Sequence, residues 1–444
     1  MLRLLLLLTL VSPLFVSAQS GPAGVGNTNG RSPLFLWLEA DRLAGNDGDT
    51  VAVWPDGSGR GNDFGEGTGA VLRRDAVNGH AALHFDGTQY FERAFGADMN
   101  PPTFTMFFVT RVEASDTYKT VISSRDDDGM SRTGYMLYAK PHSDDWSFWT
   151  AKATSDWQRL TGEGLINTWS GQTIHFQGGT DGKEMQVATV PTIKSSSPYV
   201  PNVKRPIRIG AGLNEAAKPD FYFTGDMAEI IVYGQYLNRT QRLITSNYLA
   251  AKYGYALPAH EDAYQMDELL SGDYDHDVAG IGRFNAFDMH VHARGTGIVR
   301  MLGPDGLDDN EFLLWGHDGG ALSAGTHNEV PPGLVSRLDR VWRVSETDAS
   351  GKHCVDVGTL HLSFDLTDLV GTGEISPEDV VLLVDTNGDG FFDDETPIGD
   401  ARCRRNTVYI FSGVTQLRNG SRFTVGFRNA EPTGNAAELY SNNK

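Results

Sequence analysis

Between Pro33 and Gly234 the chain alternates short apolar segments with turn residues, and this pattern limits the folds open to it. Typical segments are Phe104–Val109, Met136–Ala139 and Ile207–Ile209. The 51 glycines of the chain supply the turns that such a series needs. Strands at this spacing, without helices between them, are typical of a β-sandwich or barrel. We therefore predict an all-β protein.

One helix interrupts the strand pattern near residue 240. Asn238 can cap it, Gln241 stands at the third helical position as in a capping box, and Gly254 can end it. Leu243, Ile244, Tyr248 and Ala251 would share one apolar face, so we expect the helix to pack beside the sandwich.

A chain of 444 residues is too long for one ordinary core, so we expect two domains. A second β-rich region follows a stretch of charged residues, Pro258 and Gly272. We predict a C-terminal β-sandwich there. The predicted divisions are a flexible Gly-, Asn- and Ser-rich leader at 19–32, a first domain at 33–256, a linker at 257–272, a second domain at 273–428 and a disordered polar tail at 429–444.

The first 18 residues have the pattern of a secretion signal. Arg3 precedes the apolar run Leu4–Leu10, and the small residues Val16-Ser17-Ala18 suit a signal peptidase. The alternative is a membrane anchor, but the apolar run is too short to span a bilayer. We therefore expect a secreted or cell-surface protein that does not insert into membranes.

The charge and the cysteines narrow the class of protein further. The net charge of −20 argues against nucleic acids and anionic membranes as partners and suits cation binding. Cys354 and Cys403 are the only cysteines, and in an exported chain they would most simply form one disulfide. Two buried thiols are the alternative.

The first domain contains the segments LFLWLEADRL, VAVWPDGSGRGNDF, AALHFDGTQYFE, FTMFFVTR and the closing GDMAEIIVYGQYLNRTQRLITSNYLAAKYGY. Together these segments resemble bacterial laminin-G-like domains of the concanavalin A-like jelly-roll superfamily. The resemblance covers about residues 33–256 and implies a jelly-roll sandwich. This fold hosts lectins, carbohydrate-binding modules, adhesion domains and glycan-cleaving enzymes, so it does not by itself decide the function.

The second region contains DHDVAGIGR, LLWGHDGGAL, SRLDRVWRVSE, VVLLVDTNGDGFFDDETPI and FTVGF, within about residues 273–428. With these segments it is similar to a β-rich domain of unknown function that follows laminin-G-like domains in secreted proteins of Bacteroidetes-type bacteria. It implies no known activity.

The enzymes of the jelly-roll superfamily provide a test for catalysis. Laminarinase-like glycosidases carry Glu-x-Asp-x-x-Glu on one strand. Here Glu39-Ala-Asp41 continues to Ala44, and Glu346-Thr-Asp348 continues to Gly351, so neither has the third carboxylate. We therefore predict a non-enzymatic protein that binds a polysaccharide or cell-surface glycan. The alternatives are a glycan-cleaving enzyme with carboxylates from distant strands, and a structural envelope or matrix protein.

Three tryptophans in SDDWSFWTAKATSDWQRL are candidates for a sugar-binding surface. Trp146 and Phe148 would share one face of a strand, and Trp149 would take the other. Since one face must be core, we expect at least one tryptophan to be buried, and Trp149 or Trp157 to be the better ligand residues. The alternative is that all three pack in the core or at an edge.

The segment DTNGDGFFDDE has the spacing of a calcium-binding loop. Asp385, Asn387, Asp389 and Gly390 match positions 1, 3, 5 and 6 of an EF-hand-type loop; Phe391 would offer its carbonyl at position 7, and Asp393 stands at position 9. Position 12 is Thr396 rather than Glu, and the preceding Val380–Val384 reads as a strand. We predict a structural calcium loop between strands, or alternatively a metal-free acidic hairpin.

Overall fold

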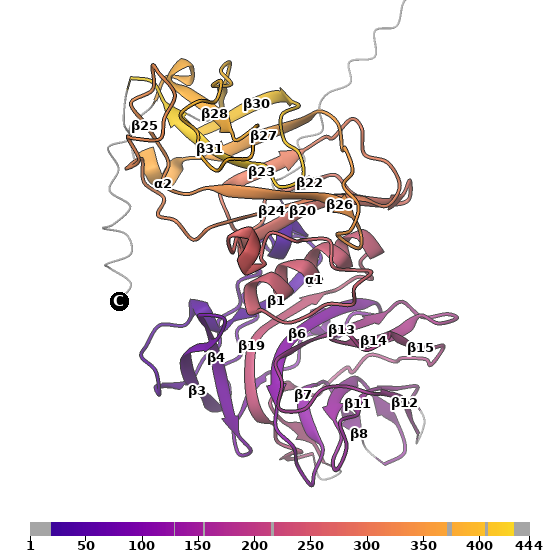
Figure 1. Cartoon of the computed structure of the whole chain (residues 1–444). Helices are drawn as coiled ribbons and strands as arrows, with labels where there is room; N and C mark the ends of the chain where they lie inside the picture. Colours follow the sequence, from indigo (N-terminus) through magenta and orange to yellow (C-terminus); the bar gives the residue numbers. More distant parts are fainter. Residues whose placement is uncertain are drawn as a thin grey trace, which may run out of the picture.

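The computed structural model describes residues 19–127, 129–153, 156–214, 217–370, 375–404 and 407–429. Among them the helices α1 (Arg239–Tyr253) and α2 (Thr367–Val370) and a few 3₁₀ turns stand against many strands (Figure 1). The prediction of an all-β protein is therefore confirmed. The predicted signal at 1–18 and nearly all of the predicted tail lie outside the described residues. No helix in the described ranges is long and apolar enough to cross a membrane.

The first domain is a sandwich of two antiparallel sheets. The sheet beside α1, here the helix-side sheet, contains β1 (Leu34–Glu39), β4 (His80–Asp86), β19 (Thr224–Tyr233), β6 (Phe104–Val112), β13 (Ser170–Phe176), β14 (Lys183–Val187) and β15 (Ile193–Ser195). The opposite sheet, here the open sheet, contains β12 (Trp157–Gly162), β11 (Trp146–Ala151), β10 (Tyr135–Ala139), β7 (Lys119–Ser123), β16 (Ile207–Ile209) and β5 (Tyr90–Arg93).

The long strand β3 (Glu66–Val77) joins the two sheets, because it pairs with β4 in one and β5 in the other. Short pairs complete the domain: β2 (Thr50–Val51) on β3, β8 (Asp126–Asp127) with β9 (Arg132–Thr133), and β17 (Gly212–Leu213) with β18 (Pro219–Asp220). Alternation places one set of side chains from each sheet in the space between them. Leu38, Phe108, Leu137 and Phe148 are buried there.

The second domain is also a sandwich, as predicted. One sheet contains β21 (Asp288–His290), β20 (His276–Asn285), β24 (Glu311–His317), β26 (Trp342–Asp348), β31 (Arg422–Phe427), β25 (Ser336–Arg337) and β28 (Val380–Val384). The other contains β22 (His292–Ala293), β23 (Val299–Leu302), β27 (Leu360–Asp365), β30 (Val408–Val414) and β29 (Arg402–Arg404). Trp342 stacks on Phe423 in the core between them.

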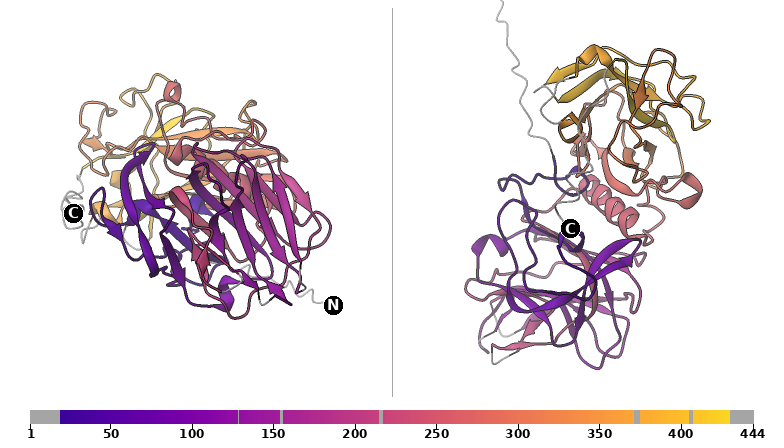
Figure 2. Two further views of the ribbon diagram at one scale, coloured as in Figure 1. Left: turned by 90° about the horizontal axis from the view of Figure 1, so that it is seen from below. Right: turned by 90° about the vertical axis from the view of Figure 1, so that its left-hand side faces the viewer.

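Helix α1 has the predicted caps. The Asn238 side chain accepts a hydrogen bond from the backbone N–H of Gln241 at 2.8 Å, and the Gln241 side chain accepts one from the Asn238 N–H at 3.3 Å. Gly254 ends the helix in the left-handed conformation. The helix lies between the helix-side sheet and β20 of the second domain (Figure 2). Its apolar residues join both domains in one shared hydrophobic core.

The predicted flexible leader is instead packed in this junction. Ala23 and Val25 are each only 1% exposed. The Tyr233 hydroxyl donates to the Val25 carbonyl at 3.1 Å, and His290 Nε2 lies 3.0 Å from the Gly24 carbonyl. A Cβ on Gly24 would lie 2.5 Å from the Cβ of Ala293, so glycine is required there. The prediction of flexibility was wrong because the surface that buries these residues comes from distant parts of the chain.

The predicted linker is likewise fixed by contacts. The buried side chain of Asn247 on α1 donates to the Glu261 carbonyl at 2.8 Å and accepts from the N–H groups of Ala263 and Tyr264, each at 2.9 Å. The Ala263 carbonyl in turn accepts from the Ser345 hydroxyl of β26. The connection between the domains is therefore part of the junction core.

The predicted disulfide is not formed in the structure. Cys354 is exposed and pairs through its backbone with Thr347 of β26, in the sheet that faces the first domain. Cys403 lies on β29, at the end of the opposite sheet, and pairs with Tyr409. The two cysteines thus belong to different layers of the sandwich.

Candidate functional site

The three candidate tryptophans separate as strand alternation requires. Trp146 is fully buried in the core of the first sandwich, so its proposed role as a ligand residue is wrong. Trp149 on β11 and Trp157 on β12 lie on the outer face of the open sheet, where Ala151 is paired with Trp157 and Trp149 with Arg159. Trp149 is half-buried and Trp157 is 9% exposed.

The two tryptophans belong to a cluster of five aromatic rings on this face, here called the platform: Tyr118, Tyr138, Trp149, Trp157 and Phe221. Trp149 lies 5.4 Å from Tyr138, 5.8 Å from Tyr118 and 6.4 Å from Trp157, between ring centroids. Phe221 lies 6.1 Å from Tyr138. Tyr118, Trp149 and Phe221 are the half-buried members of the platform, and so offer its accessible surface.

Polar groups surround the platform rings. The guanidinium of Arg159 lies over the Trp149 ring, 4.1 Å from its centroid, and the Trp149 Nε1–H donates to the Ser147 hydroxyl at 2.6 Å. The Trp157 Nε1–H is 3.4 Å from the Asp127 carboxylate. Burial would raise the pKa of Asp127, but the hydrogen bond and charge of Arg125 lower it, so this carboxylate is ionised. The rings are therefore held in fixed orientations beside charged donors and acceptors.

Three members of the platform were not predicted from the sequence: Tyr118, Tyr138 and Phe221. Tyr138 could have been found, because the alternation that places Met136 outside the core also places Tyr138 there. Phe221 carries no such signal. It lies in a turn with φ of 53°, and its carbonyl accepts hydrogen bonds from the N–H and hydroxyl of Thr120 on β7. Only the folded chain brings that turn onto the open sheet.

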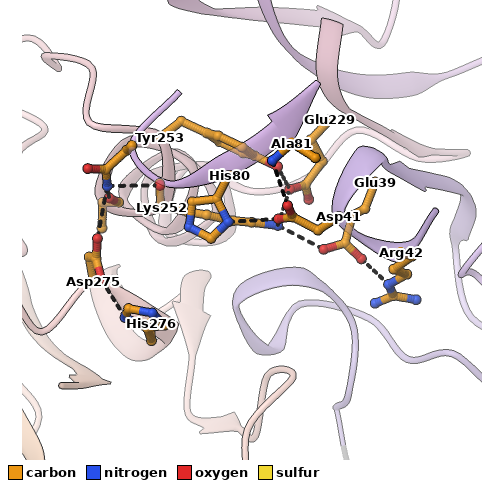
Figure 3. Close-up of polar contacts among 12 residues, drawn as sticks. Glu39, Asp41, Arg42, His80, Ala81, Glu229, Lys252, Tyr253, Asp275 and His276 are labelled. Carbon is orange, nitrogen blue, oxygen red and sulfur yellow. Dashed lines mark hydrogen bonds and ion pairs between the residues drawn. The ribbon is translucent and has the colours of Figure 1, made fainter. Parts of the chain in front are cut away.

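A second polar cluster lies on the outer face of the helix-side sheet, beneath α1 (Figure 3). Lys252 Nζ donates to Glu39 at 2.9 Å and to Glu229 at 3.0 Å. Glu229 also accepts from the hydroxyls of Tyr253 at 2.8 Å and Tyr248 at 3.2 Å. Burial alone would lower the pKa of Lys252, but the two carboxylates raise it well above its usual value. Lys252 is therefore a charged bridge that ties the helix to the sheet.

The cluster extends across the junction of the domains. His80 Nδ1 lies 2.7 Å from the Asp41 carboxylate, and the ring of His276 from the second domain is 6.4 Å from that of His80. The Asn78 side chain donates to Asp275 of the second domain at 2.9 Å. Hydrogen bonding to His80 and the charge of Lys252 lower the pKa of Asp41, against the effect of burial. These contacts make the cluster a structural joint.

The predicted calcium loop follows β28 and is closed by its own hydrogen bonds. Asp385 is buried, and its carboxylate accepts from the N–H groups of Gly388 and Gly390 at 2.6 and 3.0 Å and from Arg422 at 3.2 Å. The Asn387 Nδ2 donates to Asp389 and Asp394, at 3.1 and 3.0 Å.

The donors of this loop suit calcium in type but are not gathered as a site. Phe391 is 52% exposed, and Asp393 is exposed as well. The Glu395 carboxylate, a possible substitute for the missing twelfth ligand, instead accepts from the Thr386 N–H and hydroxyl at 2.6 and 2.7 Å. Within the described ranges no three His, Cys, Asp or Glu side chains are placed to hold a metal ion. Calcium binding therefore stays a prediction.

Comparisons with known proteins add little to this picture. A model for a domain of unknown function, DUF8202, matches residues 303–421, inside the second domain. No curated protein sequence matches the chain.

Several solved structures are similar to part of the chain. Domain 4 of AbnA, an extracellular GH43 arabinanase from Geobacillus stearothermophilus, solved with arabinotriose, is 14% identical, with a TM-score of 0.35 over 45% of this chain and 100% of that chain. The CBM40 of Ruminococcus gnavus IT-sialidase, bound to α2,3-sialyllactose, is 9% identical, with a TM-score of 0.31 over 37% and 94%. Trypanosoma rangeli sialidase, with sialic acid, is 16% identical, with a TM-score of 0.36 over 53% and 36%. The function is therefore inferred from the residues of this chain alone.

Proposed function

We propose that the chain is a secreted, non-enzymatic protein that binds a polysaccharide or cell-surface glycan on the platform. The observation that carries this proposal is the gathering of five aromatic rings outside the core, on the outer face of the open sheet. Aromatic rings are normally hidden in a sandwich core, and an outward cluster is typical of a binding surface.

The chemistry of the platform fits a sugar. The C–H-rich face of a pyranose ring can lie against an aromatic ring, whose face carries partial negative charge. The accessible surface of Tyr118, Trp149 and Phe221 offers this contact. The exposed Arg159 stands beside Trp149 and can donate hydrogen bonds to sugar hydroxyls. The rings contact one another, so little conformational entropy is lost when a ligand binds.

The burial of the carboxylates in and near the two Glu-x-Asp segments favours binding over catalysis. A glycosidase needs two carboxyl groups on either side of a cleft that admits the sugar. Beneath α1, Glu39 and Glu229 both accept from Lys252, and Glu229 also accepts from the hydroxyls of Tyr248 and Tyr253. Glu39 is 6% and Glu229 1% exposed. Glu346, in the other Glu-x-Asp segment, is also 1% exposed and accepts from the Val357 N–H.

In this proposal the second domain is a rigid spacer or a second interaction module. The shared core of the junction supports a fixed orientation of the two sandwiches. The laminin-G-like family of the first domain, the Bacteroidetes-type surface origin of the pair and the calcium loop are parts of the same proposal, and each rests on the sequence pattern.

The test is depletion of the mature chain, residues 19–444, by a panel of insoluble polysaccharides in calcium buffer. The supernatants are assayed for released reducing ends and unsaturated sugars over time. We expect depletion by at least one polysaccharide without release. Release would identify an enzyme, and neither depletion nor release would favour the structural envelope role.

A further inference from the structure

A polar cleft lies beside α1, on the side of the helix-side sheet that carries β13, β14 and β15. It has a volume of about 320 Å³ and is walled by these strands, by the first turns of α1 and by Glu261 of the connection between the domains. This volume falls in the range of small-ligand sites and suits one or two sugar residues. The cleft shares no lining residue with the platform.

The charges in the cleft favour an anion. The lining contains three cationic side chains, Lys194, Arg239 and Arg242, and two carboxylates, Glu184 and Glu261. Lys194 pairs with Glu184 at 3.4 Å, and Arg239 lies 4.0 Å from Glu261. One cation is therefore left over, although the chain as a whole has a net charge of −20.

Arg242 is that remaining cation. Its guanidinium lies 4.8 Å from the centroid of the Tyr236 ring, and Tyr236 is held by a 3.0 Å hydrogen bond to Glu184. No carboxylate of the described residues forms an ion pair with it, and its Nη1 is buried without a hydrogen-bond partner. The half-buried guanidinium lines the cleft without a carboxylate partner in the described part of the chain, so the acidic group of a ligand can pair with it.

The remaining lining groups favour a sugar over a simple anion. The side chains of Thr173, Gln186, Thr192 and Ser246 are neutral donors and acceptors of the kind that bind hydroxyl groups. His175 adds no charge, because burial and the nearby charges of Arg242 and Lys194 lower its pKa well below the usual value. Its Nδ1 lies 3.3 Å from the Thr105 hydroxyl.

We propose that this cleft binds an acidic sugar residue, with its carboxylate or sulfate ester on Arg242 and its hydroxyl groups on the neutral side chains of the lining. The site is separate from the platform and does not depend on it. A polysaccharide with acidic residues could use both sites, but each site can be tested alone.

Isothermal titration tests the cleft with matched probes: trigalacturonate, its fully methyl-esterified form and a sulfated galactose oligosaccharide. We expect binding of at least one charged probe and much weaker binding of the ester. The charged probe that binds shows whether the cleft takes a uronate or a sulfate ester. Equal binding of the ester would overturn the proposal, and so would a result in which neither charged probe binds. Inorganic sulfate that binds as tightly as the oligosaccharides would also overturn it, since the hydroxyl contacts would then add nothing.

The variants assign the binding to Arg242. Arg242→Gln should weaken binding of the charged probe about tenfold or more, the usual effect of losing a charge-assisted hydrogen bond. Arg31→Gln, which removes the same charge from an exposed position, should leave binding unchanged. Thermal melting checks that each variant folds, and Arg242→Lys, which keeps the charge, provides a milder change. Unchanged affinity in folded Arg242→Gln would overturn the assignment. Trp149→Ala should retain cleft binding, so the platform and the cleft can fail independently.

Discussion

The two sheets of the first sandwich bury similar apolar inner faces, but their outer faces differ. The outer face of the helix-side sheet lies under α1 and the second domain, where Lys252 and its carboxylates are enclosed (Figures 2 and 3). The outer face of the open sheet carries aromatic rings, three of which are half-buried, and faces away from the second domain (Figure 1). The enclosed charges around Lys252 thus have a structural role and the aromatic rings of the platform have the proposed binding role, the reverse of what residue type alone would indicate.

Removing the side chain of Lys252, which bridges Glu39 and Glu229 beneath α1, should cause the largest loss in the free energy of unfolding. In Lys252→Ala the buried Glu229 would lose its ion-pair partner and the buried Glu39 would keep only its ion pair with Arg42, so we expect a loss of about 3–5 kcal/mol in the free energy of unfolding. Denaturant unfolding measures it. The control is Lys140→Ala, which breaks the more exposed 3.0 Å pair with Asp145 and should cost about 1 kcal/mol or less. Equal effects in the two variants would mean that the covered cluster is not a joint.

On the open face, Trp149→Ala should separate binding from stability. We expect the affinity for the polysaccharide identified by depletion to fall by about 2 kcal/mol or more, as for a central aromatic contact. The loss of stability should be smaller than in Lys252→Ala, because Trp149 is half-buried. Depletion curves and thermal melts measure the two effects. Ser143→Ala, in the exposed turn before β11, serves as the control. Unchanged affinity in Trp149→Ala would move the glycan site away from the platform.

The N-terminal segment extends the covered face and can be tested by a smaller truncation. Val25 is 1% exposed, so Val25→Ala should lower the free energy of unfolding by about 1.5–2.5 kcal/mol, from two lost methyl groups and the cavity they leave. Val53 is 48% exposed, and Val53→Ala should stay within about 0.5 kcal/mol of the wild type. Equal small effects would show that residues 19–25 do not contribute to the junction.

Acid should lower the free energy of unfolding through His290, which contacts the N-terminal segment in the junction between the domains. Burial lowers its pKa to about 4, whereas an unfolded histidine titrates near 6.5. Between these values the unfolded chain binds a proton that the folded chain does not, so stability is full above about pH 6.5 and falls as the pH decreases toward 4. We expect unfolding measured at pH 7 and pH 5 to show a smaller loss in His290→Gln than in the wild type, by about 1–2 kcal/mol.

The exposed His142 provides the control for this titration. His142→Gln should keep the pH dependence of the wild type. If His290→Gln also keeps it, the acid response belongs to other groups of the junction.

Features that depend on residues close together in the sequence were predicted correctly, whereas features that depend on residues far apart in the sequence were not. The caps of α1 and the alternation around Trp149 depend on neighbouring residues, and both could be read from the sequence. The burial of Val25 depends on Tyr233, which is 208 positions away, and nothing in a Gly- and Asn-rich segment indicates it. The disulfide was predicted only because the chain has two cysteines, whereas Cys354 pairs with a strand of one sheet and Cys403 lies on a strand of the other. Likewise, the sequence could nominate Trp157 for the platform but not Phe221, whose turn is brought there by the fold.

The smallest expected effect comes from calcium at the loop after β28. Asp385 already accepts hydrogen bonds from Gly388, Gly390 and Arg422, so Asp385→Ala should destabilise the loop whether or not a metal binds. Metal removal is therefore the sharper test. For a dissociation constant in the roughly 10⁻⁴–10⁻³ M range of extracellular modules, calcium about fivefold above that constant should add about 1 kcal/mol. We expect the melting temperature to fall on addition of EDTA and to recover when calcium is restored, and Asp389→Ala to abolish the response. A melting temperature that EDTA leaves unchanged would make the loop a metal-free acidic hairpin, stabilised by its own backbone hydrogen bonds and by Arg422.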